Sequence, residues 1–140
     1  MFLETSVITI NVPPCSKPRM TRADKWKKRQ CVTKFFAFRD AVRQSIGPFF
    51  ASPDGGLHNR IFETTKFESF DIEFYIQMPK SWSKKKKAKM NGEPHKQRPD
   101  LDNYIKAWCD SVFEEDSVVW RFKASKRWTD KEGHIKLSTL

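Results

Sequence analysis

Two aspartates separated by one residue, Asp100 and Asp102, are the residues whose types and spacing are best suited to chemistry. Lys106 follows the second aspartate by four residues, and a further acidic cluster stands at 114–116. Carboxylate oxygens are the ligands that hard cations such as Mg²⁺ take, usually one or two per ion. If the backbone from 100 to 102 is extended, both carboxylates lie on one side and Leu101 points into the core. The pattern predicts a divalent-metal site.

The residues after Asp102 are expected to form a helix that arranges the neighbouring charges. Lys106 lies one turn on and shares a face with Asp102, where a lysine can contact phosphate or stabilise negative charge. Asp110 continues this face but lies about 12 Å along the helix from Asp102. That distance is too great to share a metal, so Asp110 is assigned a supporting role. Asp116 can return to the two aspartates only if the helix ends near Asp110 and the chain doubles back.

A simpler interpretation of Asp102 is that its side chain only caps the helix that follows. Capping would explain the residue without any metal. The combination with Lys106, a second acidic cluster and several basic segments favours the metal site.

The charge of the chain indicates a polyanionic partner. The formal net charge is +10, and nucleic acid is the usual partner of such a basic protein. Tryptophans interleave with three basic segments, which suits binding to a phosphate backbone with base stacking, although a lysine run is also typical of a solvated helix face. The residues expected to contact DNA are Lys17, Arg19, Arg22, Lys25, Trp26, Lys84, Lys85, Lys86, Lys87, Arg98, Lys126 and Arg127.

Other features argue against several classes of protein. No apolar run is long enough to span a membrane and the N-terminus lacks a signal pattern, so a cytoplasmic setting is expected. The three cysteines form no C-x-x-C pair, which argues against disulfides and thiolate zinc, and Cys109 is interpreted as a buried apolar filler. The three histidines lack metal-ligand spacing and are expected to be surface or locally bonded residues.

The elements that must position these residues follow from hydrophobic periodicity and turn signals. Strands are predicted at 6–12, 70–78, 118–125 and 135–139, with a turn at 129–133. Helices are predicted at 33–46, stopped by Gly47-Pro48, from Ser83 to Gly92, and from about 102. Loops are predicted at 15–32 and 48–65. We expect one α+β domain over 1–140, with a mixed sheet of about four strands packed on two to three helices in two layers.

The motif Pro99-Asp100-Leu101-Asp102-Asn103, with Lys106, Asp110 and Glu115-Asp116-Ser117, resembles the signature of RusA-type Holliday-junction resolvases. Segments 14–26 and 79–86 also resemble this family of endodeoxyribonucleases, which is common in bacteriophages and prophages. The resemblance implies a homodimer that cuts four-way DNA junctions with Mg²⁺, in a bacterial cell or a phage-infected bacterium. It also implies that Asp100, Asp102 and Asp116 are the catalytic, metal-binding carboxylates and Lys106 the catalytic lysine. Glu115 stands where the family often has aspartate.

The leading hypothesis is therefore a Mg²⁺-dependent nuclease that resolves four-way junctions by paired nicks, with Mn²⁺ as a substitute cofactor. One alternative is a structure-selective nuclease acting on flaps or other branched DNA. The other is a non-catalytic DNA-binding protein whose acidic motif only caps a helix.

Overall fold

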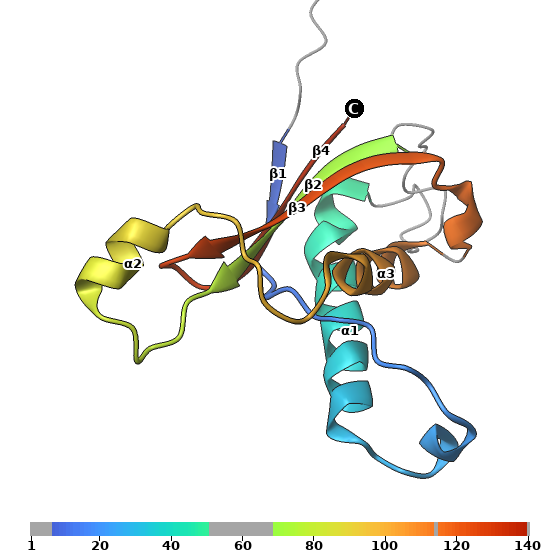
Figure 1. The fold of residues 1–140 in the computed structure, drawn as a ribbon. Helices are drawn as coiled ribbons and strands as arrows, with labels where there is room; N and C mark the ends of the chain where they lie inside the picture. The colour runs from blue at the N-terminus through green and yellow to red at the C-terminus, as the bar shows by residue number, and fades with distance from the viewer. Residues whose placement is uncertain (1–6, 51–68, 114, 140) are drawn as a thin grey trace, which may run out of the picture.

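A four-stranded mixed sheet forms the centre of the computed structural model, which describes residues 7–50, 69–113 and 115–139 (Figure 1). The strands are β1 (Val7–Ile10), β2 (Ser69–Gln77), β3 (Arg121–Thr129) and β4 (His134–Thr139), in the order β1-β4-β2-β3. β2 and β3 run parallel, and the other neighbours run antiparallel. The helices are α1 (Gln30–Phe50), α2 (Lys84–Met90) and α3 (Leu101–Val112). These elements confirm the predicted α+β fold.

The alternation of β2 explains the two layers. Phe70, Ile72 and Phe74 are buried and join the core with residues of α1 and α3, whereas Asp71 and Glu73 are only half-buried. Alternate residues of a strand face opposite sides of its sheet. One side of the sheet is therefore covered by α1 and α3, which pack on each other, and the other side is polar. α2 contributes no buried residue and stands beyond one end of the sheet (Figure 1).

The predicted boundaries of the first helix were wrong at both ends. α1 begins at Gln30, inside the predicted loop 15–32, which also contains a short 3-10 turn, η1 (Arg22–Lys25). It also continues through Gly47 and Pro48. A proline near a helix end removes only one backbone hydrogen bond, and the burial of Val42 and Ile46 holds this part of α1 against the core. The rest of the predicted loop, 51–65, lies outside the described residues.

The third strand also differs from its prediction. Residues 116–118 form a 3-10 turn, η4 (Asp116–Val118), and Val118, Trp120 and Phe122 are exposed rather than buried. β3 pairs with β2 from Ser69↔Arg121 to Gln77↔Thr129, so backbone pairing extends the strand past the predicted end at 125. Local alternation could not show this long-range pairing.

Smaller predictions were mostly confirmed. The Ser83 hydroxyl caps α2 by accepting from the Lys86 backbone N–H at 3.2 Å, and Gly92 has a φ of 80° just after it. Burial raises the pKa of Cys109 to about 12, as expected of a packed thiol. His95 is an exception, because it is buried against Trp128 rather than exposed. His58 lies outside the described residues.

Within the part of the chain that the structure describes, no helix is both long and apolar enough to cross a membrane.

Candidate functional site

Asp100 and Asp102 lie at the start of α3, and both are exposed. Asp100 is the N-cap residue, with extended backbone, yet its side chain makes no capping hydrogen bond. Neither carboxylate has a hydrogen-bond or ion-pair partner among the described residues. The positive end of the helix dipole favours negative charge here. Both carboxylates are therefore available to a ligand, and the capping interpretation of Asp102 was wrong because Asp100 occupies the cap.

The local backbone differs from the expected extended stretch. The helix begins at Leu101, so Asp102 already belongs to the first turn rather than to a strand-like segment. Leu101 packs against the core as predicted. The helical backbone that begins at Leu101, rather than the alternation of side chains along an extended strand, therefore sets the directions of the two carboxylates.

Four charged side chains form an alternating series beside the two aspartates. The Lys106 Nζ lies 2.8 Å from Asp116 Oδ2 and 3.5 Å from Asp110 Oδ1, and the Lys17 Nζ lies 3.3 Å from the other Asp110 oxygen. The hydrogen bond to Asp116 and the nearby Asp110 raise the pKa of Lys106. The same lysine lowers the pKa of Asp116. Asp110 therefore links the N-terminal segment to α3, and its supporting role in the site stays a prediction.

Asp116 returns to the helix, but not in the way the sequence suggested. A helix ending near Asp110 was thought necessary, whereas α3 continues to Val112. The chain doubles back and brings Asp116, the first residue of η4, to Lys106. Glu115 precedes it as an exposed N-cap residue. The Lys106 ammonium group thus lies between two carboxylates, those of Asp116 and Asp110.

The donor set suits a hard cation only in part. Across residues 7–50, 69–113 and 115–139, no three His, Cys, Asp or Glu side chains gather closely enough to hold a metal ion. At the start of α3, Asp100 and Asp102 supply carboxylate oxygens that have no competing partner among the described residues, which is the one-or-two-carboxylate arrangement that Mg²⁺ accepts. The Asp116 carboxylate is already paired with Lys106. Asp100 and Asp102 fit a two-carboxylate site, and Asp116 is held at Lys106.

Lys126 supports the loop that carries Asp100. Its Nζ donates to the carbonyl oxygens of Gln97 at 2.6 Å and Pro99 at 2.7 Å. In the sheet Lys126 pairs with the buried Phe74, so its side chain lies on the helix-covered side. Lys126 was predicted to contact DNA, and this internal role was missed. Alternate residues of a strand face the same side, so Lys126 faces the same side as the buried Trp128, two residues later. This alternation is the sequence signal that could have shown the internal position of Lys126.

Replacing Lys126 by Met is expected to slow DNA cleavage by about tenfold or more while the fold is kept, because small displacements of catalytic groups are costly. The change removes both hydrogen bonds to the loop before Asp100. Lys123→Met is the matched control, since it removes the same charge from the same strand at an exposed position. Initial cleavage rates at saturating DNA give the comparison. Equal losses in the two variants would contradict a role in holding the loop.

The other predicted DNA-contacting residues lie in several places. Exposed side chains belong to the loop around η1 and to α2, where Lys86 lies 4.1 Å over the Trp82 ring. Lys17 has internal contacts with Asp110 and the Phe35 ring, and Arg127 donates to the Gly92 carbonyl. Their DNA contacts remain predictions. The predicted residues that are exposed are Arg19, Arg22, Lys25, Trp26, Lys84, Lys85, Lys86 and Arg98.

The start of α3 lies between these two basic regions in the view of Figure 1, with α2 on one side and the η1 loop on the other.

A protein-family model covers the part of the chain that carries the acidic residues. A model of the family described as Endodeoxyribonuclease RusA matches residues 57–138, which is more than half of the chain. Uncharacterized protein YqaN of Bacillus subtilis (strain 168) is 37% identical over 71 residues, which cover 45% of this chain and 50% of that protein. The chain thus spans about half the length of this curated relative. The family match includes α2, α3 and β3 but excludes the basic segment 17–29.

Proposed function

Because this chain belongs to the RusA endodeoxyribonuclease family, we propose that it resolves four-way DNA junctions in a Mg²⁺-dependent reaction, by paired and symmetric nicks. The observation that carries the proposal is the pair of carboxylates at the start of α3, Asp100 and Asp102, which have no partner among the described residues. Two free negative charges on a protein of net charge +10 would repel DNA unless a cation lies between them.

Each residue of the site has a proposed task. Asp100 and Asp102 would hold Mg²⁺, or Mn²⁺ in its place, and the bound ion would neutralise phosphate charge and activate water. Lys106 would stabilise negative charge that develops on the scissile phosphate. Asp110 and Asp116 keep its ammonium charged and oriented through their ion pairs. Asp116 is the ion-pair partner of Lys106, and it would become a third carboxylate of the site only if it left the lysine and moved toward Asp100 and Asp102.

The exposed basic residues would bind the arms of the junction. Phosphate contacts position a protein on DNA without reading sequence. The lysines of α2 and the cations of the η1 loop flank the start of α3, so they would hold the backbone on both sides of the carboxylates. We propose branched DNA as the partner and the cytoplasm as the setting.

A homodimer is part of the proposal. A four-way junction has two-fold symmetry, and an isologous dimer would present two equivalent sites to two equivalent strands. Light scattering of the free protein would give the mass of the particle directly.

The decisive experiment compares three labelled substrates: a four-way junction, a flap and a linear duplex. With Mg²⁺, paired nicks in the junction alone are expected, and none when EDTA removes the metal. Comparable rates on flaps would instead support a broader structure-selective nuclease. Intact DNA in every reaction with folded protein, together with no thermal shift by Mg²⁺ or Mn²⁺, would support a non-catalytic DNA-binding protein and overturn the proposal.

A further inference from the structure

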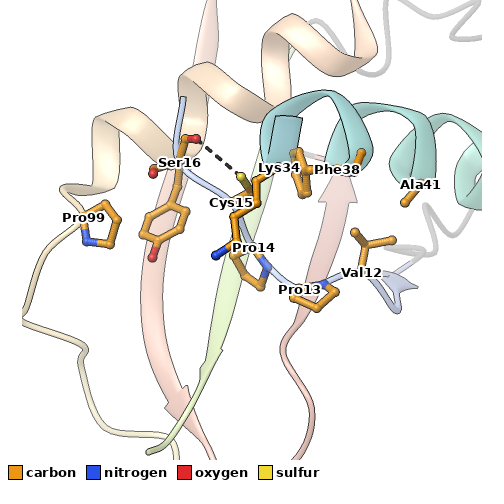
Figure 2. A pocket seen from close by; sticks show the side chains of 11 residues that line it. Val12, Pro13, Pro14, Cys15, Ser16, Lys34, Phe38, Ala41 and Pro99 are labelled. Carbon is orange, nitrogen blue, oxygen red and sulfur yellow. Dashed lines mark hydrogen bonds between the residues drawn. The ribbon is translucent and has the colours of Figure 1, made fainter. Parts of the chain in front are cut away.

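A cavity of about 450 Å³ opens between the segment that follows β1, one side of α1 and the start of α3 (Figure 2). Its size lies within the range of small-molecule sites, about 300–1,000 Å³. Val12, Pro13, Pro14 and Phe38 give it apolar walls. These flat, rigid surfaces suit a planar apolar group better than a flexible chain.

Polar groups stand among the apolar walls. The Tyr104 ring is buried and stacked on Phe74 at 5.4 Å, and burial raises the pKa of its hydroxyl. No hydrogen bond joins that hydroxyl to another described residue. The exposed Lys34 also lines the cavity and has no ion-pair partner in the part of the chain described. Apolar walls with a few unused polar groups are typical of a site for a specific ligand.

The cavity adjoins the candidate active site through Pro99. Pro99 lines the cavity, and its chain neighbour is Asp100, with Cα atoms about 3.8 Å apart. The Lys126 Nζ donates a hydrogen bond to the Pro99 carbonyl oxygen at 2.7 Å. This one contact holds both the cavity wall at Pro99 and the backbone next to Asp100. Any group in the cavity would therefore lie beside the scissile phosphate at the proposed Asp100 site.

We propose that this cavity accepts one nucleobase unstacked from the branch point of the DNA, an inference that rests on the proposed nuclease function. A nucleobase has a planar apolar face and a hydrogen-bonding edge, which match the proline-rich walls and the Tyr104 hydroxyl. The Lys34 charge at the cavity suits the phosphate attached to that base. Unstacking is cheapest at unpaired or strained positions, and a branch point supplies them.

The test uses four-way junctions that carry 2-aminopurine at each branch-point nucleotide in turn, because this base analogue fluoresces strongly when it is unstacked. EDTA prevents cleavage, and anisotropy of a separate label reports binding. A several-fold rise in fluorescence is expected at one position when the unmodified protein binds. Ala37→Phe would fill the cavity and reduce this rise to near the free-DNA level, with affinity changed less than about threefold.

Two further variants sharpen the test. Gln44→Phe adds the same ring at an exposed position of α1 outside the cavity and should leave the response unchanged. Tyr104→Phe removes only the hydroxyl and should reduce the response in part. Bound junctions without any fluorescence rise would overturn the base-binding site and leave the nuclease proposal standing. Failure of the unmodified protein to bind junctions would overturn both proposals.

The same samples exclude a different occupant. If Ala37→Phe shifts the oligomeric state in light scattering but leaves the fluorescence response intact, a second copy of the chain fills the cavity and the base-binding site is wrong.

Discussion

Junction cleavage is expected to fall by at least about 100-fold when Asp102 is replaced by Asn, because removing one electrostatic group at a reacting phosphate typically costs that much. The substitution keeps the size of the side chain and removes one of two unpartnered carboxylates at the start of α3. Junction affinity should stay the same or rise slightly, since a negative charge near the DNA backbone is lost. Single-turnover cleavage and an anisotropy titration in EDTA measure the two effects separately.

Asp130→Asn is the matched control for Asp102→Asn. Asp130 is also exposed, and it lies in the turn before β4, away from α3. Its replacement changes the net charge by the same amount and should leave cleavage within about twofold of the unmodified protein. Normal cleavage by Asp102→Asn would show that this carboxylate does not take part in the reaction.

Replacing Lys106 by Met is expected to lower the cleavage rate by about 100-fold or more through loss of a charge that stabilises the transition state. The change also removes the partner of Asp116, which it contacts at 2.8 Å, whereas Asp110 keeps Lys17 at 3.3 Å. The pKa of Asp116, now held low by Lys106, should therefore rise. Its carboxylate resonance, followed by NMR against pH, gives a readout that does not depend on activity.

The sign of the pH effect follows from the direction of that shift. A carboxyl group whose folded pKa is depressed stabilises the protein above its unfolded pKa, and this contribution is lost as the pH falls through the folded value. Lys106→Met should therefore flatten the acid side of the stability curve slightly. Lys89→Met, an exposed lysine of α2, is the control for charge and should change neither the Asp116 titration nor its pH profile. An unshifted Asp116 resonance in Lys106→Met would contradict the ion pair.

Local sequence signals were sufficient wherever one short segment decides its own structure. The alternation from Phe70 to Ile76 predicted β2, the Ser83 hydroxyl predicted the start of α2, and the helix expected from about Asp102 begins one residue earlier, at Leu101. Each signal depends on neighbouring residues and on a single face. The position of both free carboxylates at one helix end was therefore accessible from the sequence.

Features set by distant segments were not accessible in the same way. The end of β3 depends on its pairing with β2, and the continuation of α1 past Pro48 depends on burial against other elements. The two carbonyl contacts of Lys126 require knowledge of which side of the sheet it occupies. Charge alone therefore made Lys126 look like a DNA contact.

The parallel pairing of β2 with β3 has a consequence for how the site can change. Asp100, Lys106 and Asp116 all belong to the one connection that leaves β2 and returns as β3, and the two strands are hydrogen-bonded along their whole length. The pairing of β2 with β3 therefore fixes both ends of this connection in the sheet. An insertion between α3 and η4 would move Asp116 relative to Lys106 without disturbing the sheet or the start of α3. The spacing of Asp116 can thus change over evolution independently of Asp100 and Asp102.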